Sequence, residues 1–281
     1  MIRSIATVTL GGSLPEKLVA IAEAGFRNIE LTDSDLEGFP GTPADVRRLV
    51  DSLGLRILVF QPLRDFEGRP REHVQQHLAR AQRMLETTHA LGATTMMVCS
   101  NVAEDGTGDD ELRVGDLRVL ADQAAQSGVR IGYEALSWGR FASLYRDAWR
   151  LVERVAHPNF GLVLDTFHTL ALDDDLSLLQ TIPADRIFLI QVADAPRLSC
   201  DLVEWSRHHR CLPGDGELDL QSFLAIPLQN GYQGPVSLEV FSDRRTSEPP
   251  KAVAMQAYRS LCKLEFETRK SLSVEYRRYA A

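Results

Sequence analysis

Short apolar runs rich in β-branched residues alternate with longer amphipathic segments along almost the whole chain. The short runs have the length of buried strands, and the longer segments repeat apolar residues at helical spacing. The expected strands are Arg3–Val8, Asn28–Leu31, Arg56–Phe60, Thr94–Cys99, Arg130–Tyr133, Gly161–Leu164, Ile187–Gln191 and Val236–Val240. The expected helices between them include Leu14–Ala24, Ala44–Leu53, Glu72–Leu91, Asp110–Ser127 and Leu144–Val155.

This alternation predicts an α/β fold with parallel strands, because each strand is followed by a helix or by room for one. Gly25, Gly54, Gly92 and Gly128 stand where helices should end. Eight such units within 281 residues indicate a single (β/α)8 TIM barrel. A doubly wound sheet usually carries a GxGxxG or GxxxxGK[ST] motif, and this chain has neither.

We assign residues 1–264 to a catalytic barrel and residues 265–281 to a C-terminal tail or linker. The final segment reads ETRKSLSVEYRRYAA and shows little apolar periodicity. It is typical of a frayed helix or of a connection to a further domain.

The charge balance limits the classes of partner. The chain has 31 Lys and Arg against 39 Asp and Glu, a formal net charge of −8. Nucleic acids and anionic membranes attract basic surfaces, so neither is an expected partner, whereas a small anionic substrate needs only a few local arginines. No apolar run approaches the ~18 residues of a membrane span, and the N-terminus shows no signal peptide, so we expect a cytoplasmic location. The sequence leaves assembly into a homo-oligomer open.

The four cysteines are expected to be free thiols. Cys99, Cys200, Cys211 and Cys262 form no CxxC pair and match no zinc-site spacing. Two disulfides are arithmetically allowed, but a chain with a core of this size does not need them.

Four consecutive strands end in side chains that offer oxygen ligands. Glu134 follows IGY, Asp165 follows GLVL, Gln191 ends FLIQ, and Glu239 lies within VSLEV. Each alone is explained as a strand-end cap or a salt-bridge partner. On consecutive strands they converge at the barrel mouth, where the carboxylates repel one another unless a cation lies between them. We therefore predict a divalent cation, Mg²⁺, Mn²⁺ or Co²⁺, bound by these four residues.

His168 lies three residues beyond Asp165 and is the candidate general base. A neutral imidazole beside a cation is well placed to accept a proton near neutral pH. A buried histidine with local hydrogen bonds is the alternative, in which case Glu134 or a metal-bound hydroxide becomes the better candidate base. The remaining histidines are weaker candidates: His73, His77, His89, His157, His208 and His209.

Two loops, Gln61–Arg71 and Val192–Leu218, are longer than the repeat requires, and both follow strands at the active-site face. They contain Arg64, Arg69, Arg71, Arg207 and Arg210. Guanidinium groups gathered at the mouth favour capture of a carboxylate or phosphate. The alternative is that Arg64 and Arg207 form solvated ion pairs with acidic neighbours in sequence.

These residues resemble the xylose-isomerase-like barrel superfamily of sugar isomerases and epimerases, which also has an endonuclease branch. More narrowly, seven runs resemble bacterial 3-dehydroshikimate dehydratases: SIATVTL, VFQPLRDFEG, VCSNV, IGYEALSWGR, LDTFHTL, QVADAP and EWSRHHRCLPGDGELD. The resemblance extends from Ser4 to about Leu264. Strand seven of the wider superfamily usually supplies a histidine ligand, and Gln191 at that place agrees with the dehydratase branch.

The resemblance implies metal-dependent dehydration of 3-dehydroshikimate to protocatechuate, a hydro-lyase reaction of quinate and shikimate breakdown. For this reaction we choose His168 as the base, Arg69 and Arg210 as the anchors of the ring carboxylate, and Ser206 as a polar contact to the ring oxygens. Some dehydratases of this kind continue into a C-terminal domain resembling hydroxyphenylpyruvate dioxygenase.

Two other functions remain open at this point. A sugar or inositol isomerase or epimerase on the same barrel would interconvert neutral ketoses and give no aromatic product. A non-enzymatic barrel would hold its metal only to bind or to scaffold. The net charge disfavours the endonuclease branch.

Overall fold

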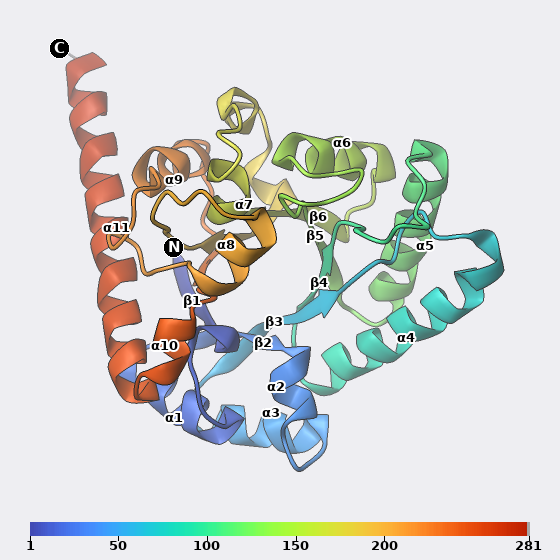
Figure 1. Ribbon diagram of the computed structural model, residues 1–281, viewed down its shortest axis with the longest axis horizontal. Coiled ribbons are helices and arrows are strands. Elements are labelled where there is room, and N and C mark those ends of the chain that lie inside the picture. Colours follow the sequence, from blue (N-terminus) through green and yellow to red (C-terminus); the bar gives the residue numbers. More distant parts are fainter. Residues whose placement is uncertain (280–281) are drawn as a thin grey trace.

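Eight parallel strands close into a barrel in the computed structural model, which describes the backbone of residues 1–279 and the side chains of residues 1–273 (Figure 1). The strands are β1 (Ile2–Ala6), β2 (Asn28–Thr32), β3 (Arg56–Leu63), β4 (Thr95–Cys99), β5 (Arg130–Glu134), β6 (Phe160–Asp165), β7 (Ile187–Val192) and β8 (Pro235–Leu238). Each pairs with its neighbours in sequence, and β8 pairs with β1. The predicted TIM barrel is confirmed.

Helices surround this barrel (Figure 1). They are α1 (Leu14–Ala24), α2 (Asp33–Glu37), α3 (Pro43–Ser52), α4 (Val74–Ala90), α5 (Asp110–Gln126), α6 (Tyr145–Val155), α7 (Thr166–Leu170), α8 (Leu202–His208), α9 (Leu220–Gln229), α10 (Asp243–Ser247) and α11 (Pro250–Tyr279). Short 3₁₀ turns add η1 (Thr7–Thr9), η2 (Arg71–His73), η3 (Ser177–Gln180) and η4 (Ala184–Arg186). Among the described residues, no helix is long and apolar enough to cross a membrane.

Local sequence signals explain where the helices begin and end. Ser13 and Glu16 form a capping box at the start of α1, in which Glu16 accepts from the backbone N–H of Ser13 at 2.9 Å. Gly25 ends the same helix with a φ of 107°, a left-handed conformation that glycine adopts without steric cost. The predicted glycine stops are thus confirmed there.

The sixth unit departs from the regular repeat. β6 is followed by the five-residue helix α7 and then by the turns η3 and η4 rather than by a long helix. The first and last strands also end earlier than expected: β1 stops at Ala6, where η1 begins, and β8 stops at Leu238. Glu239 therefore lies one residue beyond its strand.

The segment after Leu264 continues the last helix. α11 runs through the expected boundary without interruption along one side of the barrel, where it packs against α1 and α9 (Figure 1). Thr268 is fully buried, and Glu265 accepts a hydrogen bond from Arg3 at 2.8 Å. The helix thus belongs to the barrel's packing at least as far as Thr268. Residues 280–281 of the predicted tail lie outside the described residues, and its role as a linker stays a prediction.

A small apolar cluster forms part of the support for the strand ends. It is separate from the main core and comprises Val59, Met97, Cys99, Leu136, Val163 and Leu189. Met97, Cys99 and Leu136 also line the cavity described below, so apolar contacts hold one wall of the site. All four cysteines are free, as expected.

Candidate metal centre

The four predicted metal ligands come together at the carboxyl ends of β5 to β8. Glu134 is the last residue of β5, and Asp165 is the last of β6, in register with Gln191 of β7. Glu239 directly follows β8. Each of the four is at most 4% exposed. Closure of the barrel therefore forces three carboxylates and one amide into a space from which water is largely excluded.

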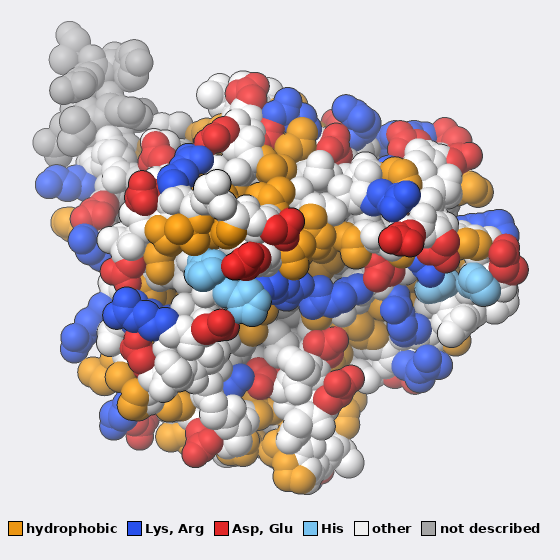
Figure 2. Space-filling model, viewed as in Figure 1, with side chains coloured by type: hydrophobic (Ala, Val, Ile, Leu, Met, Phe, Trp, Pro, Cys, Tyr) orange, Lys and Arg blue, Asp and Glu red, His pale blue; other side chains and the backbone are white. Residues whose placement is uncertain are grey.

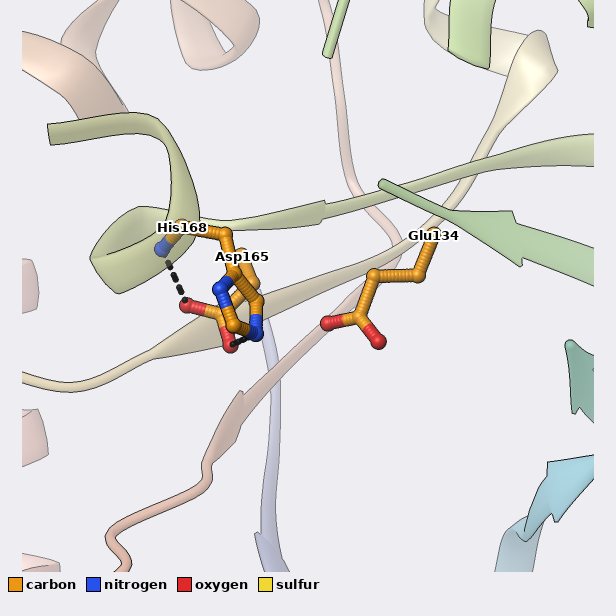
Figure 3. A group of neighbouring side chains, drawn as sticks. All are labelled: Glu134, Asp165 and His168. Atoms are coloured by element: carbon orange, nitrogen blue, oxygen red, sulfur yellow. Dashed lines mark hydrogen bonds and ion pairs between the residues drawn. The ribbon is translucent and has the colours of Figure 1, made fainter. Parts of the chain in front are cut away.

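Glu134, Asp165 and His168 offer ligand atoms that all lie within 4.8 Å of one another. Figure 3 shows the Glu134 carboxylate extending from its strand toward the Asp165 and His168 pair. Oxygen and imidazole donors at this separation form a candidate divalent metal site. His168 is thus placed where it can serve as a ligand or as a base.

Unsatisfied oxygen atoms provide an independent test of this assignment. Among the described side chains, Oε1 of Glu134 and Oε1 of Gln191 are buried and have no hydrogen-bond partner. A buried acceptor without a partner is costly, and native proteins rarely leave one. Two such oxygens beside Asp165 fit a bound cation.

Asp165 is also the N-cap residue of α7. Its Oδ1 accepts the backbone N–H groups of Phe167 at 2.6 Å and His168 at 3.4 Å, which caps α7. The cap fixes the start of the short helix and thereby places His168 close to the carboxylate. Oδ2 stays directed at the basic group described next.

Arg210 brings a positive charge into the centre. It is 2% exposed, and its Nη1 lies 2.8 Å from Oδ2 of Asp165 and 3.4 Å from Oε2 of Glu239. Its Nη2 donates to Oγ of Ser206 at 2.8 Å. The structure therefore joins Arg210 and Ser206, both predicted from the sequence, to the metal-ligand group.

Arg210 does not fully compensate the negative charge of the three carboxylates, as the directions of their pKa shifts indicate. Burial, followed by repulsion from Glu239 and Asp165, raises the pKa of Glu134 well above its ordinary value. Burial also raises the pKa of Glu239, although Arg210 opposes the shift. For Asp165, burial acts in the same sense, but attraction to Arg210 and the surrounding hydrogen bonds keep the pKa below its ordinary value. The centre thus favours further positive charge, which a divalent cation supplies.

His168 is held as a neutral imidazole. Burial lowers the pKa of His168 to about 3 against the attraction of Asp165. Nδ1 lies 3.1 Å from the hydroxyl and 3.2 Å from the backbone nitrogen of Ser137, and Nε2 lies 3.1 Å from Nη2 of Arg210. Donors therefore face both ring nitrogens, and because a neutral imidazole carries one lone pair, it can accept from only one of them. Trp138 packs edge-on against the ring at a centroid distance of 5.0 Å.

Two polar residues of this network were not found from the sequence. Glu30 of β2 is fully buried, and Gln61 of β3 is 3% exposed. Burial, followed by repulsion from Glu239, raises the pKa of Glu30 to about 8. The available signal was a charged residue in a strand of a parallel sheet, where both faces are normally buried.

A small cavity of about 20 Å³ lies against the centre. Glu134, His168, Ser206 and Glu239 line it, together with three arginines, Arg64, Arg207 and Arg210. Figure 2 shows histidine and basic side chains grouped in the middle of one face of an otherwise mixed surface.

Arg207 is held by aromatic rings. Its guanidinium carbon lies 4.9 Å from the ring centroid of Phe241 and 5.6 Å from that of Trp138. Burial, together with the positive charges of Arg64 and Arg210, lowers the pKa of Arg207. Among the described residues, neither Arg64 nor Arg207 forms an ion pair with a carboxylate. The predicted alternative of local ion pairs is therefore absent there, and the cavity wall favours an anion.

Arg69, the other arginine predicted to anchor a carboxylate, is not among the residues that line the cavity. Its guanidinium pairs with Asp105 and lies 3.4 Å from Nε2 of His77. The same loop reaches the cavity through Arg64 instead. Glu67 anchors that loop, since it accepts from the hydroxyl of Tyr133 at 2.7 Å and from the backbone of Asn101 at 2.9 Å.

The family described as the xylose isomerase-like TIM barrel matches residues 18–264. This chain belongs to that family. The family-level resemblance expected from the sequence is confirmed, and the TIM barrel is the architecture that the family's description names.

Two curated relatives are both named 3-dehydroshikimate dehydratase. The chain is 50% identical over 275 residues to the protein of Pseudomonas putida and 52% identical over 272 residues to that of Pseudomonas aeruginosa. These matches cover 98% and 97% of this chain but 43% of each relative. The chain therefore spans less than half the length of the relatives it matches.

A solved structure has nearly the same fold. It is called a xylose isomerase-like TIM barrel/4-hydroxyphenylpyruvate dioxygenase fusion protein, and it superposes with a TM-score of 0.96 at 49% identity. The match covers 98% of this chain and 44% of that chain. The matched part of the fusion protein thus corresponds to nearly the whole of the present chain.

We expect the EDTA-treated protein to bind one Mn²⁺ per chain, and Glu134→Ala or Glu239→Ala to abolish tight binding by removing an oxygen ligand. Calorimetric titration measures both. Glu67→Gln is the matched control, because it neutralises a buried glutamate that lies outside the ligand group and should leave the affinity unchanged. Wild-type affinity in Glu134→Ala would remove that residue from the site.

Proposed function

We propose that this barrel, loaded with a divalent cation, dehydrates 3-dehydroshikimate to protocatechuate and is therefore a hydro-lyase. The observation that carries the proposal is the juxtaposition of a buried oxygen-ligand group with the guanidinium groups of Arg64 and Arg207, which have no carboxylate partner among the described residues. A ketone substrate with a ring carboxylate needs both. The names of the two Pseudomonas relatives support this substrate.

The reaction requires removal of an acidic C–H proton beside a ketone and departure of a hydroxyl one carbon further on. When bound, the cation would supply Lewis-acid stabilisation of the negative charge that develops on the ketone oxygen. Glu134, Asp165, Gln191 and Glu239 would hold it, and their hard oxygen donors suit Mg²⁺, Mn²⁺ or Co²⁺.

His168 would act as the general base. Its neutral ring carries one lone pair, with which it can accept the proton from the substrate carbon once the donor facing that nitrogen is displaced. The imidazolium formed can return that proton to the departing hydroxyl, which leaves as water. A further proton shift then gives the aromatic ring, so the net change is loss of one water.

The arginines would orient the substrate. Arg207 is pre-positioned between Phe241 and Trp138, so a carboxylate meets a guanidinium that has already lost much of its side-chain freedom. Arg64 lines the same wall, while Arg210 and Ser206 link the carboxylate side to the metal ligands. The predicted role of Arg69 remains to be tested beside them.

A dioxygenase-like domain beyond residue 281 in a full-length protein stays a prediction, and the fusion protein supports it.

Protocatechuate formation tests the function directly. We expect the EDTA-stripped protein to be inactive toward 3-dehydroshikimate and to regain activity when a single metal is restored, followed by ultraviolet absorbance of the product. Neutral ketoses and inososes serve as the competing substrates. Turnover of those without any aromatic product would establish the isomerase alternative instead.

His168→Ala should reduce kcat by ~10²–10⁴-fold, the usual contribution of a general base. Its Mn²⁺ affinity should match that of the wild type, as titration can show. If affinity fell together with kcat, His168 would be a metal ligand rather than the base.

Arg207→Ala should raise KM about tenfold or more, because a charge-assisted bond to the substrate carboxylate is lost. Arg207→Lys should restore binding only in part, since an ammonium lacks the planar fork. Arg69→Ala is the matched variant from the neighbouring loop. A larger increase in KM for Arg69→Ala than for Arg207→Ala would show that Arg69, as predicted from the sequence, binds the substrate carboxylate.

A further inference from the structure

Glu30 is a fully buried glutamate that touches two amide side chains of the candidate metal centre. Its Oε2 accepts a hydrogen bond from Nε2 of Gln191 at 2.9 Å and another from Nε2 of Gln61 at 3.0 Å. Neither the proposed metal ligation nor the proposed chemistry uses Glu30.

The bond to Gln191 determines which end of that amide faces the cation. A side-chain amide carries an oxygen that binds metal and a nitrogen that does not, and the two have nearly the same shape. A carboxylate oxygen can only accept from the nitrogen. With Nε2 directed at Glu30, the Oε1 atom of Gln191 points elsewhere, and it is buried without a hydrogen-bond partner among the described residues.

Glu30 accepts these bonds in either protonation state. Its other oxygen, Oε1, also lacks a hydrogen-bond partner among the described residues. A proton carried there would leave Oε2 available to both amides.

Gln61 links Glu30 to the carboxylate of Glu239. Its Nε2 also donates to Oε1 of Glu239 at 2.9 Å. The other oxygen of Glu239, Oε2, is the one that approaches Arg210. Gln61 thus occupies one oxygen of Glu239 and leaves the other on the side of the centre.

We propose that Glu30 is a positioning residue that orients the amide of Gln191 so that its oxygen faces the metal, and that Gln61 transmits this orientation to Glu239. The inference rests on the metal-dependent part of the proposed function and is independent of the substrate. Outer contacts of this kind typically contribute 10–100-fold to metal affinity.

A purely electrostatic role makes a different prediction. If Glu30 acted only through its charge, any residue that kept the charge would suffice, and its effect would be the same whatever stood at position 191. Orientation instead requires the correct distance and a donor on the facing side chain.

The experiment is a Mn²⁺ titration of EDTA-treated protein by calorimetry, with thermal unfolding to confirm that each variant is folded. Glu30→Gln should weaken Mn²⁺ binding ~10–100-fold, because the new amide can donate to Gln191 and turn its oxygen away from the cation. Glu30→Asp keeps the charge but withdraws the carboxylate by one methylene, so it should also weaken binding.

The exchange Glu30→Gln with Gln191→Glu tests the contact itself. It restores one donor facing one carboxylate and keeps the total charge, so the loss caused by Glu30→Gln should be largely absent in the Gln191→Glu background. The two substitutions should be coupled by about tenfold or more. Glu67→Gln again controls for the loss of a buried carboxylate.

Three results would overturn the proposal. They are wild-type affinity in Glu30→Gln or in Glu30→Asp, equal loss of affinity from Glu30→Gln in both backgrounds, and no Mn²⁺ uptake by the wild type. If Glu30→Gln does not fold, Glu30→Asp decides alone. Normal Mn²⁺ binding without conversion of 3-dehydroshikimate would reject the proposed function and leave the role of Glu30 standing.

Discussion

Negative charge buried at the barrel mouth is the constraint on which the rest of the site depends. Glu30, Glu134, Asp165 and Glu239 are nearly inaccessible to water, and closure of the sheet leaves them no way to separate. Desolvation of several carboxylates in one place is strongly unfavourable unless each finds a donor or a cation. Most of the polar groups around these carboxylates donate hydrogen bonds or positive charge that offset the cost of their desolvation.

The compensation is graded from one carboxylate to the next. Asp165 has the most, with a helix cap on one oxygen and Arg210 on the other, and its pKa remains low. Glu134 has the least: in the described network, a thiol donor from Cys99 at 3.2 Å reaches one oxygen and nothing reaches the other. Because Glu134 has the fewest donors, the position beside Glu134 is where an added positive charge would be most stabilising.

The cavity wall carries positive charge, opposite in sign to the group of buried carboxylates. Arg64, Arg207 and Arg210 lie close enough to one another that their mutual repulsion contributes to the lowered pKa of Arg207. Stacking on Phe241 and Trp138 holds Arg207 without neutralising it, whereas an ion pair with a carboxylate would satisfy it. A protein with net charge −8 can therefore still present a local cationic wall to an anionic substrate.

The fold and the positions of the oxygen-bearing side chains at the strand ends could be predicted because they depend on local patterns. An apolar run that ends in Glu134 or Asp165 identifies both the strand and its active end. Arg64 could not be distinguished from Arg69, because the direction of each side chain depends on how Glu67 ties the loop to Asn101 and Tyr133. Such contacts join distant parts of the chain, and no spacing along the sequence encodes them.

Gln191 illustrates why an amide suits this crowded site. A fifth carboxylate at that position would add an oxygen ligand together with another charge to be compensated. A glutamine adds the oxygen without the charge. Unlike a carboxylate, however, it can bind a cation in only one of its two amide orientations, because its NH2 group repels a cation. A neutral amide ligand at this position would therefore need to be oriented. Glu30 meets that need with a carboxyl group already buried beside the amide, whose Oε2 accepts from Nε2 of Gln191 and so determines where the amide oxygen points.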